Sequence, residues 1–117
     1  MECLYEDTAD GVRVIRLAGR MDLEGNEKIA LQFNTLTAAA GPAVIVDLSS
    51  VDFLSSLGIG TILTGAKNVT LRKGVVVLCG ARPHVLSALE RTHVTTMIPM
   101  CATLGEARVR VTTPAES

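Results

Sequence analysis

The sequence predicts an α/β fold: one domain, residues 1–117, with a mixed sheet of four to five strands, an amino-terminal hairpin and about four helices packed largely on one face. Its 117 residues suit one domain with its own hydrophobic core. Apolar residues make up 48% of the chain but aromatic residues only 3%, so aliphatic side chains must fill that core. After a first pair of strands, β-branched runs alternate with segments of helical periodicity, which predicts parallel strands joined by right-handed crossovers.

The first third of the chain predicts a hairpin followed by a helix. Residues 2–6 and 12–17 are strand-like runs separated by Asp10 and Gly11, a pair favoured in tight hairpin turns. Residues 19–22 break the strand pattern. A helix follows and ends before Gly41 and Pro42. Its apolar face is marked by Ile29, Phe33, Leu36 and Ala40.

A buried strand and a second helix form the middle of the chain. Residues 43–46 are a continuous apolar run, typical of a strand covered on both faces. Residues 47–52 are expected to form a polar connection, from which Phe53 and Leu54 lead into the helix. That helix should run for roughly four turns and stop at Gly74, with Arg72 and Lys73 in its last turn. Its predicted apolar stripe is Ile59, Ile62, Leu63, Ala66 and Val69, with Thr61, Thr64 and Lys67 facing outward.

The last third alternates short strands and helices. Residues 75–79 predict a buried strand, and a shorter helix begins at residues 82–84 with Pro83 in its first turn. Residues 97–100 predict an edge strand, because proline is tolerated at the edges of sheets. Thr103 and Glu106 have the spacing of a capping box and predict a final helix.

Composition argues against several classes of partner. Eleven basic and twelve acidic residues leave a net charge of −1, and the chain has neither a basic cluster nor an aromatic platform for nucleic acid. No apolar run approaches the length of a membrane span, and the first residues are acidic rather than signal-like, so we expect a cytoplasmic protein without direct membrane insertion. Three cysteines without metal-ligand spacing are expected to be reduced and structural. No metal or cofactor is predicted.

Two adjacent serines precede the second helix. A serine oxygen there can accept a hydrogen bond from a free backbone N–H and cap the helix, which is the simplest explanation of the pair. One cap needs only one serine, so Ser55 and Ser56 leave a second hydroxyl available, next to a first turn kept narrow by Gly58 and Gly60. A phosphate added there would be tolerated by the helix amino terminus but would repel a partner suited to a neutral surface. The pattern thus indicates a switch without catalysis.

Signals for an enzyme are weak. Gly58, Ile59 and Gly60 are a fragment of a dinucleotide fingerprint without its third glycine. His84 and His93 lie nine residues apart and form no constellation with Ser56 and an acid. The GxSxG motif of esterases is absent. We therefore expect no catalytic residues.

In their order and spacing, LAGRMD, VIVDLSSVDFLSSLGIGTIL and VVVLCGARPHVLSALERT resemble the STAS domain of bacterial anti-sigma factor antagonists, over nearly the whole chain. The middle block is the specific part. The resemblance implies a regulator that binds an anti-sigma factor serine kinase when unphosphorylated, is released by phosphorylation, and is restored by a serine phosphatase. It also implies a monomer or weak dimer, with no enzymatic activity and no cofactor.

By position, the resemblance places the phosphoacceptor on Ser56, with Ser55 as the second choice. Ser55 stands where an aspartate is common in the family, and Leu57 replaces a frequent small polar residue. Asp22 matches an acidic position that contributes to partner contact, although a helix cap explains it equally well. The implied partner-binding residues are Asp22, Ser55, Ser56, Leu57, Gly58 and Ile59. The alternative is a constitutive STAS scaffold or transporter-associated module in which the serines only cap the helix.

Overall fold

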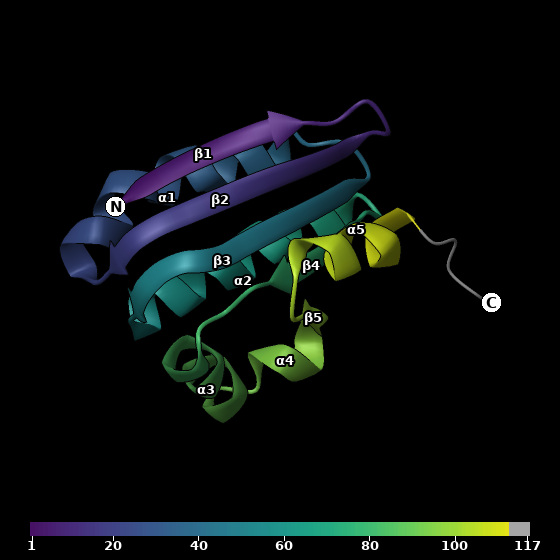
Figure 1. The fold of residues 1–117 in the computed structure, drawn as a ribbon. Coiled ribbons are helices and arrows are strands. Elements are labelled where there is room, and N and C mark those ends of the chain that lie inside the picture. Colours follow the sequence, from purple (N-terminus) through teal and green to yellow (C-terminus); the bar gives the residue numbers. More distant parts are fainter. Residues whose placement is uncertain (113–117) are drawn as a thin grey trace.

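Five strands form one mixed sheet in the order β1-β2-β3-β4-β5, seen in the computed structural model, which describes residues 1–112 (Figure 1). β1 is antiparallel to β2, which confirms the predicted hairpin, and the remaining neighbours are parallel. The strands are β1 (Glu2–Asp7), β2 (Val12–Met21), β3 (Ala43–Leu54), β4 (Val75–Cys79) and β5 (Met100–Cys101).

The helices cover the two faces of the sheet unequally. Figure 1 shows α1 and α2 side by side behind the sheet and α5 in front of it. The hydrophobic residues that α1 to α4 bury share one core cluster, and α5 contributes Ala107 to a smaller cluster on the opposite face. The predicted fold is confirmed, and the structure adds α5 on the second face. The helices are α1 (Leu23–Ala38), α2 (Ser56–Leu71), α3 (Pro83–Arg91), α4 (Val94–Met97) and α5 (Leu104–Thr112).

β3 is longer than the sequence pattern indicates. It continues to Leu54, so the prediction that residues 47–52 form a connection is wrong. The register against β2 shifts twice, each time with one extra residue on β3. Because of these bulges, buried and exposed side chains do not alternate in this part of β3. Leu48, Val51 and Leu54 are buried at intervals of three instead, so the sequence lacks the period of two that predicts a strand. β2 likewise continues to Met21 through residues predicted to break it.

Two element ends also differ from prediction. α2 ends at Leu71, and the left-handed residue after it is Lys73 (φ 63°) rather than Gly74. A glycine is needed at position 74 for lack of room rather than for its backbone angles, because a Cβ there would lie 2.9 Å from the Pro42 carbonyl oxygen. The predicted strand at residues 97–100 begins only at Met100, since the short α4 occupies residues 94–97. α5 is confirmed with its cap, in which Thr103 Oγ1 accepts a hydrogen bond from Glu106 N at 3.1 Å.

Candidate functional site

A single residue connects each of two parallel strands to the helix that follows it. Asp22 lies between β2 and α1, and Ser55 lies between β3 and α2. Because Met21 is paired with Leu54 in the sheet, these two connecting residues are neighbours at the carboxyl edge of the strands. The amino termini of α1 and α2 therefore meet at one place on the surface, and their partial positive charges add there.

Ser55 is fixed by three hydrogen bonds. Its Oγ accepts from Gly58 N at 3.1 Å, which caps α2, and donates to the Met21 carbonyl oxygen at 2.6 Å. Its backbone N–H donates to that same oxygen at 3.0 Å. The predicted cap is confirmed, and the Ser55 hydroxyl is engaged in holding β2, β3 and α2 together.

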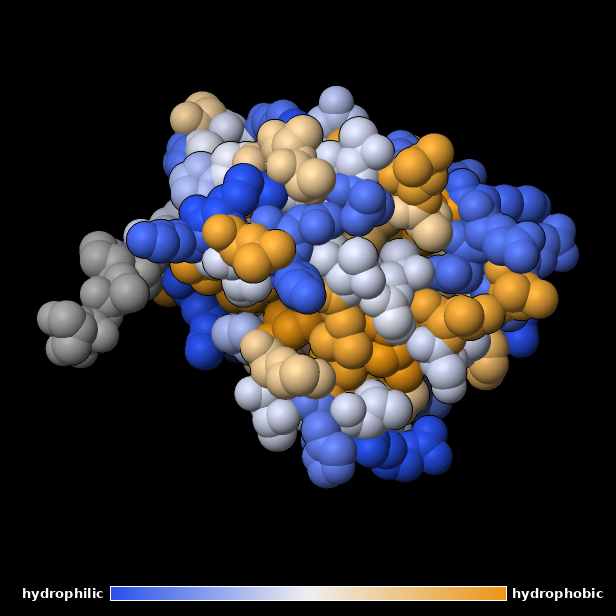
Figure 2. Space-filling model, turned by 180° about the vertical axis from the view of Figure 1, so that it is seen from behind, coloured by the Kyte–Doolittle hydropathy of each residue, from blue (hydrophilic) through white to orange (hydrophobic). Residues whose placement is uncertain are grey.

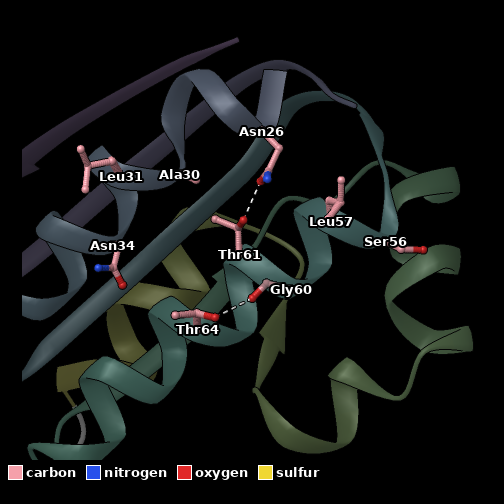
Figure 3. Close-up of a pocket in the computed structure, with 9 residues that line it drawn as sticks. All are labelled: Asn26, Ala30, Leu31, Asn34, Ser56, Leu57, Gly60, Thr61 and Thr64. Atoms are coloured by element: carbon pink, nitrogen blue, oxygen red, sulfur yellow. Dashed lines mark hydrogen bonds between the residues drawn. The ribbon is translucent and has the colours of Figure 1, made fainter. Parts of the chain in front are cut away.

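Ser56 has the opposite surroundings. It is the first residue of α2 and is exposed, and within residues 1–112 its hydroxyl has no hydrogen-bond partner. Figure 3 shows this hydroxyl directed away from Thr61 and Asn26. The first turn of α2 itself contains no acidic residue that would offset the positive end of the helix. Ser56 thus presents a free hydroxyl at the positive end of a helix.

Asp22 is the cap of α1. Its Oδ1 accepts from Gly25 N at 2.8 Å, and its Oδ2 lies 3.7 Å from Arg20 Nε. The hydrogen bond from Gly25 and the nearby guanidinium of Arg20 lower the pKa of this carboxyl below its ordinary value. Asp22 is therefore a charged residue with a defined structural role, 44% exposed at its side chain and close to the start of α2.

Of the other predicted contact residues, the structure brings only Leu57 to the surface, where it is 52% exposed. Gly58 and Ile59 lie on the buried side of the same turn. A Cβ at Gly58 would lie 2.7 Å from Met21 Cγ and 3.0 Å from Leu54 Cδ1, so glycine lets α2 begin directly against the strand ends. These two residues therefore support the first turn of α2 from its buried side and are not themselves exposed to a partner.

A groove between α1 and α2 was not predicted from the sequence. It has a volume of about 530 Å³, and Ser56 and Leu57 lie at one end of it. A hydrogen bond of 2.5 Å from Thr61 Oγ1 to Asn26 Oδ1 links the two helices inside it (Figure 3). Figure 2 shows this face of the molecule, where hydrophobic residues are exposed among hydrophilic ones. The groove is lined by Asn26, Ala30, Leu31, Asn34, Ser56, Leu57, Gly60, Thr61 and Thr64.

Charged groups around the end of β3 were also missed. Arg82 forms an ion pair with Asp52 and donates to the Ser49 carbonyl oxygen at 3.1 Å, and His84 Nε2 donates to the Asp52 carbonyl oxygen. These partners are about thirty residues apart in sequence, so no local spacing could have indicated them. They join the start of α3 to the strand that leads to Ser55. Within the described residues, no three His, Cys, Asp or Glu side chains are grouped to hold a metal ion, and no helix is long and apolar enough to cross a bilayer.

The chain is similar to several known proteins over most of its length. It is 27% identical over 97 residues to a putative anti-sigma factor antagonist, BtrV, from Bordetella bronchiseptica, covering 83% of this chain and 84% of that protein. Among solved structures, an anti-sigma factor antagonist from Mycobacterium paratuberculosis has a TM-score of 0.86 and 25% identity, with 96% of this chain and 94% of that one covered.

Two further solved structures have the same fold, one from an anti-sigma factor antagonist and one from a transporter family protein. The anti-sigma factor antagonist SpoIIAA in its unphosphorylated form has a TM-score of 0.70 and 25% identity, covering 94% of this chain and 97% of that one. A sulfate transporter family protein from Wolinella succinogenes, with 15% identity, a TM-score of 0.72 and coverage of 92% and 98%, shares the fold alone. The family model described as the STAS domain matches residues 7–107, so the chain belongs to the STAS domain family.

Proposed function

We propose that this chain is an anti-sigma factor antagonist that binds its anti-sigma factor when Ser56 is unmodified and is released when Ser56 is phosphorylated. The observation that carries the proposal is the contrast between two adjacent serines. Ser55 is bonded as the helix cap, whereas the Ser56 hydroxyl is exposed and without a partner in residues 1–112. The names of the relatives support the antagonist role.

The charge at the start of α2 gives a physical reason for the switch. A phosphate on Ser56 would carry about −1.5 to −2 charges at neutral pH. The uncapped N–H groups of the first turn and the absence of an acid there would stabilise that charge within this domain. A partner packed against Leu57 and a neutral hydroxyl would have to bury an unpaired dianion, so the complex would dissociate.

The proposed interface is centred on the start of α2. Asp22, Ser56 and Leu57 would contact the partner, while Ser55, Gly58 and Ile59 would hold the turn in place. The partner is an anti-sigma factor that is also a serine kinase, and a serine phosphatase would restore the binding form. In this proposal the whole chain, residues 1–117, is one non-enzymatic STAS domain that acts in the bacterial cytoplasm as a monomer or weak dimer.

The test uses two matched serine variants. Wild type, Ser56→Ala and Ser55→Ala are incubated with the anti-sigma factor kinase of the same organism and ATP, and phosphorylated peptides are mapped by mass spectrometry. Wild type and Ser55→Ala should gain one phosphate on Ser56, and Ser56→Ala should gain none. A phosphate found only on Ser55, or on neither serine, would contradict the proposal.

Binding provides the second measurement. Ser56→Ala should bind the kinase as wild type does and stay bound after ATP is added, whereas Ser56→Asp should bind more weakly, by at least about tenfold, or ~1.4 kcal/mol. Ser55→Ala is the control for a general disturbance of the turn. Equal affinity of the Ala and Asp variants at position 56 would show that charge does not control binding.

The second candidate is a constitutive STAS scaffold or transporter-associated module. The observation in its favour is Ser55, which stands where an aspartate is common in the switch proteins, together with the fold shared with a transporter family protein. Genes beside this one distinguish the two candidates. A small kinase gene supports the switch, and transporter genes support the scaffold.

A further inference from the structure

One row of side chains crosses four of the five strands at the level of Cys79. The register pairs Arg16 on β2 with Asp47 on β3, Asp47 with Cys79 on β4, and Cys79 with Cys101 on β5. Arg16 Nε lies 3.7 Å from Asp47 Oδ2. Two thiols therefore stand directly opposite each other on neighbouring parallel strands, at the end of a row of charged residues.

Both thiols belong to the face of the sheet that α5 covers. Cys79 is in the smaller core cluster with Ala107 of α5, and Cys101 packs against that cluster. Neighbouring strands are ~4.8 Å apart, which falls within the Cα separation of ~4.4–6.8 Å that a disulfide bridges. The Cα spacing therefore suits a disulfide, whose formation also needs the two Cβ atoms to approach to ~3.5–4.5 Å. Both are free thiols in the structure.

The two thiols differ in access. Cys79 is fully buried, and desolvation, then the charge of Asp47 and the neighbouring Cys101, raise its pKa to about 12. Cys101 is only partly buried and lines a cavity of about 320 Å³ at the β5 edge, together with Ala81, Leu86, Met100 and Ala102. A small oxidant can therefore approach Cys101 first, while Cys79 is held next to it.

We propose that Cys79 and Cys101 form a reversible oxidation site, at which a hydroperoxide converts the facing thiols into a disulfide. The Cys101 thiolate attacks one peroxide oxygen, the O–O bond breaks, and the second oxygen leaves with the electron pair, so that Cys101 becomes a sulfenic acid. The Cys79 sulfur then attacks the Cys101 sulfur, loses its proton and expels water. With hydrogen peroxide, one peroxide is reduced to two waters while two thiols are oxidised.

The disulfide would close a loop that holds α3 and α4. Residues 80–100 lie between the two cysteines, and the start of this segment contains Arg82 and His84, which bind the end of β3. Oxidation would thus link β5 covalently to β4 and restrict the segment that contacts the end of β3. The proposal is independent of the proposed function, because it requires no partner and no phosphate.

The test uses the full chain, reduced with dithiothreitol, freed of reductant and treated with equimolar hydrogen peroxide. Intact mass should fall by two hydrogen atoms, and a non-reducing peptide map should show one link, between Cys79 and Cys101, that dithiothreitol removes. Cys3 is an internal control, because it is buried in the core cluster on the other face of the sheet. It should remain a free thiol after the reaction.

Two variants sharpen the result. Cys3→Ser should lose the same two hydrogen atoms as wild type, and Cys101→Ser should lose none. If a variant folds poorly, the peptide map of the wild type still shows which two cysteines are linked and so tests the proposal by itself. Stable sulfinic acid on Cys101 with Cys79 still free, a link that includes Cys3, or a link between two chains would each overturn the proposal.

Discussion

Ser55 and Ser56 are the same residue type in adjacent positions, yet the structure uses them differently. Ser55 has extended backbone angles (φ −83°, ψ 169°), which turn its hydroxyl back toward Gly58 N and the Met21 carbonyl. Ser56 already belongs to the helix, so its side chain points outward. The sequence could predict this division of roles, because an N-cap position must come immediately before the first helical residue.

This contrast predicts different costs for removing each hydroxyl. Ser55→Ala should lower the free energy of unfolding by about 1 kcal/mol, within the range of ~0.5–2 kcal/mol seen for helix caps. Ser56→Ala should change it by less than ~0.5 kcal/mol, since an exposed side chain without partners contributes little. Urea unfolding of both variants and wild type measures the difference, and equal losses in the two variants would show that Ser55 is not the cap.

At the scale of elements, the hairpin, the central strand and the helices α1, α2 and α3 follow from local sequence patterns, and most of the failures have a common cause. Most failures depend on a tertiary contact, as the bulges of β3 are set by its pairing with β2. The start of α4 is a local exception, because its N-cap, His93, is left-handed (φ 63°) without being a glycine. The groove and the Asp52 contacts join residues about thirty apart in sequence. Local patterns contain no information on such pairs.

The packing of α1 against α2 provides an element-scale prediction. A Cβ at Gly65 would lie 2.3 Å from Phe33 Cε2, and Phe33 is a buried, rigid ring. Gly65→Ala should therefore lower the free energy of unfolding by about 1–3 kcal/mol, through overpacking. Gly60 is the matched control in the same helix, because a Cβ there meets nothing within 4 Å.

Gly60→Ala should raise the free energy of unfolding by about 0.5–1 kcal/mol, because alanine favours the helix and restricts the unfolded chain. Thermal and urea unfolding of both variants provide the measurement. Destabilisation by both substitutions, to a similar extent, would show that helix propensity rather than the contact with Phe33 decides the outcome.

At the scale of the whole molecule, carboxylates hold the β1–β2 hairpin together and tie it to the last helix. Asp10, in the turn between β1 and β2, pairs with Arg108 of α5 at 3.2 Å, and Asp7 pairs with Arg13 at 2.7 Å. Hydrogen bonds, from Thr8 to Asp10 and from Arg13 to Asp7, together with these charges, lower the pKa of both carboxyls, as the Gly25 N–H does for Asp22.

These shifts predict sensitivity to acid. A carboxyl whose pKa is lower in the folded state stabilises the fold above its unfolded pKa, here about 3.8, and this stabilisation is lost as pH falls through the folded pKa. The urea midpoint should therefore decrease below about pH 4. Asp22→Asn keeps a good cap but removes one such charge, so its midpoint should fall less steeply. A midpoint that rises on acidification would contradict the assignment.

The single-residue connections at Asp22 and Ser55 have a consequence for how fast and how tightly a partner binds. A surface placed on two helix starts that follow directly from strands is already ordered before any encounter. Little conformational entropy is then lost on association, which favours affinity without slow folding of a loop. A change at Ser56 would act on the lifetime of the complex more than on the rate at which it forms. Stopped-flow association and dissociation kinetics, measured with Ser56 unmodified and phosphorylated, would determine the two rate constants separately.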